Sequence, residues 1–409
     1  MKYYLIAGEA SGDLHASNLM AELKHIDDSA EFRFWGGDRM QTQGGTMVKH
    51  IRELAFMGFL EVLINIRTIL QNITLCKRDL IEYRPDVLIL IDYPGFNLRM
   101  ASFAKKKGIR TVYYISPQIW AWNQSRVYKI KRDVDKMLVI LPFEKDFYKR
   151  FGYEVVYTGH PLLDALAQNQ MQSPAEDTLQ PLPQAEMGQN TEPVQHRRTN
   201  NPKSPSSKTK NSFLATHKLP DKTLVAVLPG SRKQEISRML KVMLSVSQRF
   251  SDCHFVVAGL SGLQNIYNQT LINTSNVSIV FDQTYELLKH THAAMVVSGT
   301  ATLETALLRV PQVVCYKSNT ISYMIARRVV KVPYISLVNL IMDKPVVTEL
   351  IQDQCNDNTL AKELDKLIND KENRQRIVSD YEMLHHKLGA GGASKRAAKE
   401  IYRLSTFDL

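Results

Sequence analysis

The sequence has little of what secreted, metal-binding or membrane-spanning proteins need. Only four of its 409 residues are cysteines, Cys76, Cys253, Cys315 and Cys355, and no two of them form a C-x-x-C pair. This spacing indicates neither a zinc site nor a disulfide framework, and it is typical of a reducing compartment. No stretch reaches about 18 uninterrupted apolar residues, the length of a membrane span. We therefore expect a cytoplasmic protein without a bound metal.

The N-terminus also lacks a targeting signal, because its apolar run ends after a few residues, at Glu9. Acidic residues are in deficit, and the net charge is +11. The positive charge is spread along the chain, with clusters at 105–107, 126–132 and 327–328. No nucleic-acid-binding motif surrounds them. Each cluster fits a solvated helix face or an anionic membrane surface, so we expect no nucleic-acid partner.

The first strand-to-helix turn lacks a glycine-rich phosphate loop. Residues 6–15 read IAGEASGDLH, whereas a dinucleotide site would read G-x-G-x-x-G. The carboxylates of Glu9 and Asp13 stand where an anion would bind. A helix N-terminus favours acidic side chains, so Asp13 is explained by capping alone. The alternative is a pocket for the uncharged, hydroxyl-rich part of a substrate.

Two series of short apolar strands alternate with helical patterns. The length favours at least two domains, and the alternation predicts an α/β fold with two Rossmann-like parallel sheets. Between them, 169–218 is rich in Gln, Asn, Ser, Pro and Lys, and we interpret it as a disordered polar insert. The predicted parts are a first domain (1–168), the insert (169–218), a second domain (219–383) and a C-terminal helical segment (384–409). The expected strands are YYLIAG, DVLILID, RTVYYIS, KMLVILP and EVVYTG in the first domain, and TLVAVLPG, HFVVAG, VSIVFD, AAMVVSG and QVVCYK in the second.

Two stretches of the second domain predict a nucleotide-diphosphate site. LPGSRKQE places Ser231 and Arg232 at the carboxyl edge of a sheet, where open α/β folds bind ligands. A guanidinium suits phosphate, although Arg232 could instead pair with Glu235. In VVSGTATLE, the small residues from Ser298 to Ala301 would let backbone N–H groups approach a pyrophosphate.

Glu304 follows this small-residue turn by one helical turn, from where a carboxylate could accept hydrogen bonds from both ribose hydroxyls. A simple capping box fits part of the same spacing. No D-x-D pair lies nearby, so Arg232 and the helix dipole would neutralise the leaving diphosphate.

Asp92 ends a strand of the first domain, in LILIDYPGFN. A carboxylate facing an interdomain cleft could take a proton from an attacking hydroxyl, but a lone Asp at a strand end is also a common turn former. Farther along, Trp120 and Trp122 fit packing, and Glu144 has no evident partner in the sequence.

Taken together, these stretches resemble the lipid-A-disaccharide synthase family, GT-B glycosyltransferases of Gram-negative bacteria. The resemblance rests on nine stretches in register, which cover nearly the whole chain except the insert. They are GEASGDLHA, LAFMGFLEVL, IDYPGFN, SPQIWAW, LPFEKDFY, TGHPLLDA, LPGSRKQE, SGTATLE and YISLVNL. The resemblance implies two domains facing a cleft, and by analogy with other GT-B enzymes a C-terminal helix that crosses back to the first domain.

The resemblance also implies an activity. The family joins UDP-2,3-diacylglucosamine to 2,3-diacylglucosamine 1-phosphate (lipid X) by inversion, without a cofactor, giving a β(1→6) disaccharide and UDP. Carried over, Asp92 is the base. The UDP-binding residues would be Ser231, Arg232, Ser298, Gly299, Thr300 and Glu304, with Asn339 near the donor. The acceptor side would comprise Glu9, Ser11, Asp13 and His15.

The sequence departs from the family pattern at two positions. Relatives usually carry a second Asp where this chain has Gly95, and SLPN where this chain has SLVN, around Val338. If the second Asp were essential this chain would be inactive, so the first departure strengthens the case for Asp92.

A lipid product requires contact with a bilayer. In the stretch from Leu54 to Arg78, apolar residues cover more of a helix than one core-facing stripe needs. We expect Leu60, Leu63, Ile66 and Leu70 to face an anionic membrane, with the protein peripheral on the cytoplasmic face of the inner membrane; the alternative is a helix buried on two sides.

Rival functions remain. One is another UDP-sugar GT-B enzyme, either a MurG-like transferase or a UDP-N-acetylglucosamine 2-epimerase. The other is a non-enzymatic nucleotide-binding module. A homodimer is left open by the sequence.

Overall fold

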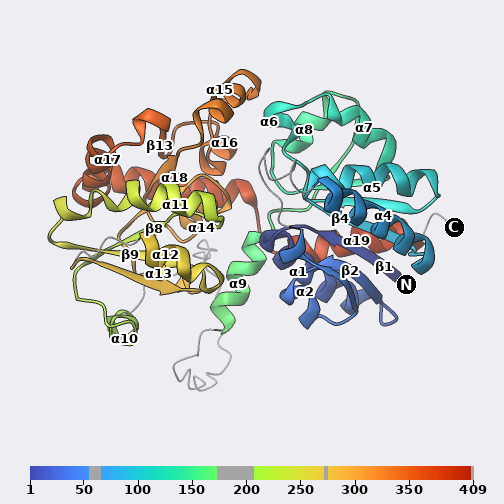
Figure 1. Cartoon of the computed structure of the whole chain (residues 1–409), viewed down its shortest axis with the longest axis horizontal. Helices are drawn as coiled ribbons and strands as arrows, with labels where there is room; N and C mark the ends of the chain where they lie inside the picture. Colours follow the sequence, from blue (N-terminus) through green and yellow to red (C-terminus); the bar gives the residue numbers. More distant parts are fainter. Residues whose placement is uncertain (55–65, 173–206, 271–274, 407–409) are drawn as a thin grey trace, which may run out of the picture.

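The computed structural model describes residues 1–54, 66–172, 207–270 and 275–406. Two parallel β-sheets, each flanked by helices, form the two halves of the molecule (Figure 1). The expected α/β fold with two Rossmann-like domains is therefore confirmed.

The first sheet has seven strands in the order β3-β2-β1-β4-β5-β6-β7. All neighbouring strands pair in parallel. The chain leaves β1 in one direction and returns to the other side of it at β4, so the strand order reverses between these two strands. The strands are β1 (Lys2–Ala7), β2 (Glu31–Gly36), β3 (Thr46–His50), β4 (Val87–Ile91), β5 (Arg110–Tyr114), β6 (Lys136–Val139) and β7 (Val156–Tyr157).

The second sheet repeats this plan with six strands in the order β10-β9-β8-β11-β12-β13. Its order reverses between β8 and β11, which pair directly. In open α/β sheets a ligand binds beyond the carboxyl ends of the strands at such a reversal. The strands are β8 (Thr223–Leu228), β9 (Cys253–Gly259), β10 (Val277–Phe281), β11 (Ala293–Val297), β12 (Gln312–Tyr316) and β13 (Thr348–Ile351).

Helices connect the strands of each sheet. Those of the first half are α1 (Ala10–Ile26), α2 (Asp38–Thr42), α4 (Ile66–Tyr83), α5 (Pro94–Lys106), α6 (Ile119–Trp122), α7 (Arg126–Asp133), α8 (Glu144–Lys149) and α9 (Leu162–Gln172). Those of the second half are α10 (Ser207–Thr216), α11 (Lys233–Leu244), α12 (Gln264–Thr270), α13 (Thr284–His290), α14 (Thr300–Leu307), α15 (Thr320–Val329), α16 (Leu337–Met342) and α17 (Asp357–Asn369).

The last two helices, α18 (Lys371–Leu388) and α19 (Ala393–Thr406), carry the chain back to the first half. Gly389 and Gly392 have φ of 81° and 86°, a left-handed conformation that favours glycine. Arg396 of α19 then donates to the carbonyl of Thr158 at 2.7 Å. Asp164 of α9 accepts from the backbone N–H of Ser394 at 2.8 Å. The expected crossing of the C-terminal helix is confirmed.

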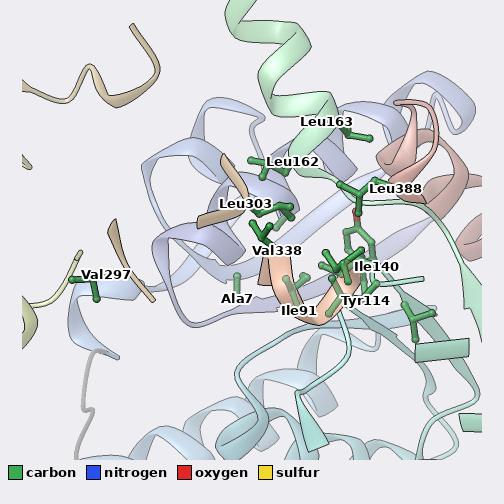
Figure 2. Packing of buried hydrophobic residues seen from close by; sticks show 14 of the residues in the cluster. Ala7, Ile91, Tyr114, Ile140, Leu162, Leu163, Val297, Leu303, Val338 and Leu388 are labelled. Carbon is green, nitrogen blue, oxygen red and sulfur yellow. The ribbon is translucent and has the colours of Figure 1, made fainter. Parts of the chain in front are cut away.

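The core is continuous between the two halves. One cluster of buried apolar side chains includes Tyr114 and Ile140 at the ends of first-sheet strands, Leu388 at the end of α18, and Leu303 and Val338 of the second half (Figure 2). The interdomain geometry therefore rests on packed side chains as well as on the two chain crossings.

Two described helices do not end at the predicted domain boundaries. Residues 207–216, placed in the insert, form α10, and its Phe213 and Leu214 are buried in a second cluster with Leu224 and Val256. Helix α18 runs across the predicted boundary at 383/384. The centre of the predicted insert, 173–206, lies outside the described residues.

Within the described residues, no helix is both long and apolar enough to cross a bilayer. All four cysteines are buried, and none of them forms a disulfide. Of the residues expected to face a membrane, Leu60 and Leu63 lie outside the described residues. Ile66 and Leu70 begin α4, and their side chains are 46% and 55% exposed.

Candidate active site

The strand-order reversals of the two sheets contribute residues to one group of charged side chains. The turns after β1 and β4 carry Glu9 and Asp92, and the turn after β8 carries Arg232. The Nη2 atom of Arg232 lies 3.2 Å from Oε2 of Glu9, so an ion pair joins the two halves here. The predicted acceptor-side turn and part of the predicted nucleotide site therefore meet.

Asp92 is held in an unusual backbone conformation. Asp92 and Tyr93 have φ of 45° and 47°, each of which costs of order 1–3 kcal/mol for a residue other than glycine. The side chain of Asn97 donates to the Asp92 carbonyl at 2.8 Å, and the Tyr113 hydroxyl donates to it at 2.5 Å. A Cβ at Gly8 would lie 2.3 Å from the Tyr93 ring, so only glycine fits there. The turn is fixed from several sides.

The pKa of the Asp92 carboxyl group lies near neutral pH. Burial raises its pKa to about 7. The negative charge of Glu9 adds to this rise, while a hydrogen bond from the Tyr93 backbone and the positive charge of Arg232 oppose it. A general base works best when its pKa lies near the working pH. Gly95, in the same turn, is exposed and a Cβ there would meet open space.

Arg232 is shared between two carboxylates. Besides Glu9, its Nη1 contacts Oε1 of Glu235 at 2.9 Å, and the Ser231 backbone donates to Oε2 of Glu235 at 3.3 Å. The alternative Arg232–Glu235 pairing is therefore present, but it does not use the whole guanidinium. Arg232 remains half-exposed, so an incoming anion can exchange with these carboxylates.

The turn after β11 leads into the N-terminus of α14. Gly299 is the N-cap of α14, and no side chain caps this helix. The capping box considered above is therefore not formed. Gly299 is exposed, a Cβ there would meet nothing within 4 Å, and Thr300 begins the helix. Ser298 instead donates its hydroxyl to the Ile335 carbonyl at 2.8 Å, which anchors the turn.

Glu304 lines a cavity of about 500 Å³ between the halves. Its carboxylate accepts a hydrogen bond from the Tyr285 hydroxyl at 3.2 Å, and burial raises its pKa. Leu14 and Arg39 contribute from the first half. Tyr285 and Arg39 were not among the site residues predicted from the sequence. Tyr285 is the second residue of α13, the helix that follows β10, and its closeness to the strand end was the available signal.

Two predicted acceptor-side residues, Asp13 and His15, are buried. The Asp13 carboxylate accepts from the backbone N–H groups of Gly37, Arg39 and Met40 at 2.7–3.1 Å, which caps α2. His15 is buried near Asp164 and His160, and burial lowers its pKa to about 4. Asp13 and His15 are therefore both buried, while Glu9 is partly accessible and Ser11 is exposed.

Asn339, predicted to lie near the donor, is also buried. Its side chain is 1% exposed. Its amide donates to the Val347 carbonyl and to Oε1 of Glu349, both at 2.9 Å, and accepts from the Val347 backbone at 3.0 Å. Glu349, which the sequence reasoning missed, also accepts from the backbones of Ile335 and Ser336 at 2.9 Å. Asn339 and Glu349 thus hold the segment that anchors Ser298.

The family model described as Lipid-A-disaccharide synthetase matches residues 3–187 and 202–401. The chain belongs to the lipid-A-disaccharide synthase family. Curated relatives with that name are similar along almost their whole length. One from Syntrophus aciditrophicus is 36% identical over 401 residues, covering 96% of this chain and 95% of the relative. One from Coxiella burnetii is 33% identical over 405 residues, covering 98% and 97%.

Membership of the lipid-A-disaccharide synthase family makes this chain a glycosyltransferase of lipid A biosynthesis. Solved structures agree on the fold. The UDP-GlcNAc 2-epimerase from Neisseria meningitidis bound to UDP-GlcNAc has a TM-score of 0.65 at 12% identity, over 98% of this chain and all of that one. The calicheamicin glycosyltransferase CalG4 has a TM-score of 0.56 at 16% identity, over 100% and 99%. These likenesses confirm a GT-B fold.

The synthase motifs around the two tryptophans also meet in space. Trp120 donates its indole N–H to Oε1 of Glu144 at 3.2 Å. The other oxygen of Glu144 accepts from the backbones of Ile140 and Leu141. Burial raises the pKa of Glu144 to about 7. Trp120 is packed as expected, and it is the partner of Glu144 that the sequence did not reveal.

Proposed function

We propose that the interdomain cleft transfers 2,3-diacylglucosamine from its UDP derivative to the 6-hydroxyl of 2,3-diacylglucosamine 1-phosphate, with inversion and without a cofactor. The new bond joins the acceptor oxygen to the anomeric carbon. The bond between that carbon and the UDP oxygen breaks, and UDP leaves with its electron pair. The observation that carries the proposal is the meeting of Glu9, Asp92 and Arg232 at the two strand-order reversals.

Asp92 is the proposed base. Its carboxylate accepts the hydroxyl proton as the acceptor oxygen attacks, and a pKa of about 7 suits this task. Hydrogen bonds from Asn97 and Tyr113 hold the backbone from which this carboxylate projects. Glycine at position 95 leaves no second carboxylate in the turn, so the role falls on Asp92. Glu9 and Ser11 are the accessible candidates for contacts with the acceptor sugar.

The nucleotide is proposed to bind the second half. Arg232 and the N–H groups at the start of α14, around Gly299 and Thr300, would hold the diphosphate. Glu304, in the interdomain cavity, would accept from the ribose hydroxyls. Ser231 lies next to Arg232 on the same turn. Ser298 and Asn339 would act from behind by fixing the backbone.

Membrane association is part of the proposal. The substrates carry acyl chains, so the enzyme must meet a bilayer, and we place it as a peripheral protein on the cytoplasmic face of the inner membrane. The exposed side chains of Ile66 and Leu70 support contact at the start of α4. An excess of eleven positive charges would favour an anionic surface.

A UDP-N-acetylglucosamine 2-epimerase is the rival function that the test must exclude. The two functions differ in their need for an acceptor. Purified protein is incubated with UDP-2,3-diacylglucosamine, with and without the acceptor lipid, and lipids are read by mass spectrometry. We expect a disaccharide 1-phosphate and equimolar UDP only when both lipids are present. Turnover of UDP-N-acetylglucosamine without an acceptor, and no disaccharide, would favour an epimerase.

A further inference from the structure

Helix α15 ends in an exposed apolar surface that the proposed chemistry does not use. The side chains of Met324, Val329 and Val330 are 53%, 39% and 39% exposed. Arg327, Arg328 and Lys331 are interleaved with them and are also exposed. Alternating apolar and basic side chains at a helix end are typical of a segment that lies in a membrane interface, where the basic groups reach the phosphates.

The first half contributes a matching feature. Trp122, at the end of α6, is 40% exposed, and the guanidinium of Arg126 lies 4.5 Å from its ring centre. The backbone N–H of Lys331 donates to the carbonyl of Ala121 at 2.8 Å. This hydrogen bond places Trp122 beside the end of α15, in agreement with the neighbouring positions of α6 and α15 (Figure 1). The two halves therefore form one surface.

The two segments that form this surface carry charged residues of one sign. The 26 residues from 317 to 342 contain four basic residues and no acidic one. On the other side of the contact, no acidic residue occurs between Asp92 and Asp133. A partner that covers the surface must therefore offer negative charge and tolerate apolar side chains.

The surface is connected to the nucleotide side of the cleft. Four residues beyond Lys331, the carbonyl of Ile335 accepts the hydroxyl hydrogen bond of Ser298. The backbone N–H of Ile335 donates a hydrogen bond to Oε2 of Glu349 at 2.9 Å. A partner bound at the end of α15 therefore contacts a segment that is hydrogen-bonded to the turn before α14.

We infer that Met324, Val329, Val330, Trp122 and their basic neighbours form a second membrane-docking surface, here called the cleft-rim surface, which binds an anionic phospholipid bilayer. The inference rests on the proposed function, which supplies the lipid substrates. The cleft-rim surface is separate from the membrane contact proposed at the start of α4. Apolar side chains enter the acyl boundary, and Arg327, Arg328 and Lys331 bind headgroup phosphates. Contact with both halves lets the bilayer lie at the rim of the cleft.

The test is sedimentation of the purified full chain with vesicles of phosphatidylcholine containing anionic phosphatidylglycerol. One variant carries Met324→Ser, Val329→Ser and Val330→Ser, and another carries Arg327→Gln, Arg328→Gln and Lys331→Gln. We expect the first to lower the vesicle partition coefficient roughly tenfold or more. The second should lower it about fivefold for each charge removed, with no loss on pure phosphatidylcholine.

Matched controls change exposed residues elsewhere. Met383→Ser, on α18, removes an apolar side chain of similar exposure from a helix that is not proposed to meet the membrane. Lys241→Gln with Lys362→Gln and Lys371→Gln removes the same charge from exposed positions of the second half. Both controls should bind vesicles like the parent chain. Circular dichroism and UDP affinity should be unchanged in all four variants, which shows that the fold and the nucleotide site are intact.

Unchanged vesicle binding in both cleft-rim variants, with a normal fold, would overturn the inference. If vesicle binding is unchanged but KM for a long-chain substrate in detergent rises, the inference is overturned as well, since the surface would then hold the substrate's acyl chains. Vesicle binding needs no turnover. Loss of binding together with an absence of disaccharide from the parent chain would contradict the proposed function alone.

Discussion

Glu9 and Arg232 form an ion pair of 3.2 Å between the first and second halves of the chain. Both charges act on Asp92, the first raising and the second lowering its pKa. Arg232 is also the proposed diphosphate ligand, so UDP must compete with Glu9 and Glu235 for it. Binding of the nucleotide and the readiness of the base are therefore electrostatically linked.

Replacement of Glu9 by glutamine should shift the pH dependence of the reaction. Asp92 accepts a proton only when ionised, so kcat/KM of the parent chain should rise with pH through about 7. Without the negative charge of Glu9 the pKa of Asp92 falls, and the rising limb moves to lower pH. The measurement is kcat/KM for UDP release between pH 5 and 9.

Glu235→Gln is the matched control, since Glu235 also pairs with Arg232 but is not among the groups that shift the pKa of Asp92. For Glu235→Gln, the rise of kcat/KM with pH should occur near the same pH as in the parent chain. A limb that moves to higher pH in Glu9→Gln, or the same shift in both variants, would contradict the electrostatic account of Asp92.

Arg232→Ala and Glu304→Ala should each weaken UDP binding. A lost charge-assisted hydrogen bond costs about 1.5–3 kcal/mol, which corresponds to roughly 10–150-fold in Kd. Isothermal titration calorimetry with UDP measures this directly, and Lys241→Ala, on the helix that follows Arg232, serves as the control. If neither variant changed the affinity, the nucleotide would have to bind elsewhere.

Asp13→Ala should destabilise the fold. Removal of its carboxylate leaves three backbone N–H groups at the start of α2 without their acceptor. The expected loss is about 1–3 kcal/mol in the free energy of unfolding, measured by urea denaturation. Ser11→Ala, on the exposed side of the same turn, is the control. An unchanged stability with a raised KM for the acceptor would return Asp13 to the acceptor site.

Stability should fall in mild acid because of two buried histidines. Burial lowers the pKa of His15 to about 4 and that of His160 to about 3, against about 6.5 in an unfolded chain. Below pH 6.5 the unfolded state binds more protons, so the free energy of unfolding decreases toward pH 4. His160→Gln should flatten this slope between pH 4.5 and 7; an equal slope in variant and parent would assign the decrease to other groups.

The regular parts of the fold could be predicted because their sequence patterns are strong. All ten expected strands are present, since each is an apolar run bounded by turn residues. Three were missed: β2, β3 and β13. The residues of β3 are mostly half-buried and β13 is four residues long, both at sheet edges, so neither shows the continuous apolar pattern of a central strand.

The candidate site was predictable where a strand end delivers the residue. Glu9, Asp92 and Arg232 follow β1, β4 and β8, and the parallel fold brings them together. The sequence could not show which polar side chains are used up by the backbone. Asp13 caps a helix 24 residues away, and the amide of Asn339 is bound to Val347. Such pairings depend on tertiary contacts, which local spacing does not reveal.

The proposed mechanism depends above all on Asp92 as the base of an inverting transfer, and single-turnover formation of the disaccharide by Asp92→Asn is its decisive test. We expect a rate lowered roughly 10²–10⁴-fold, with UDP affinity and folding close to those of the parent chain. A near-normal rate in a folded, UDP-binding Asp92→Asn variant would contradict this mechanism.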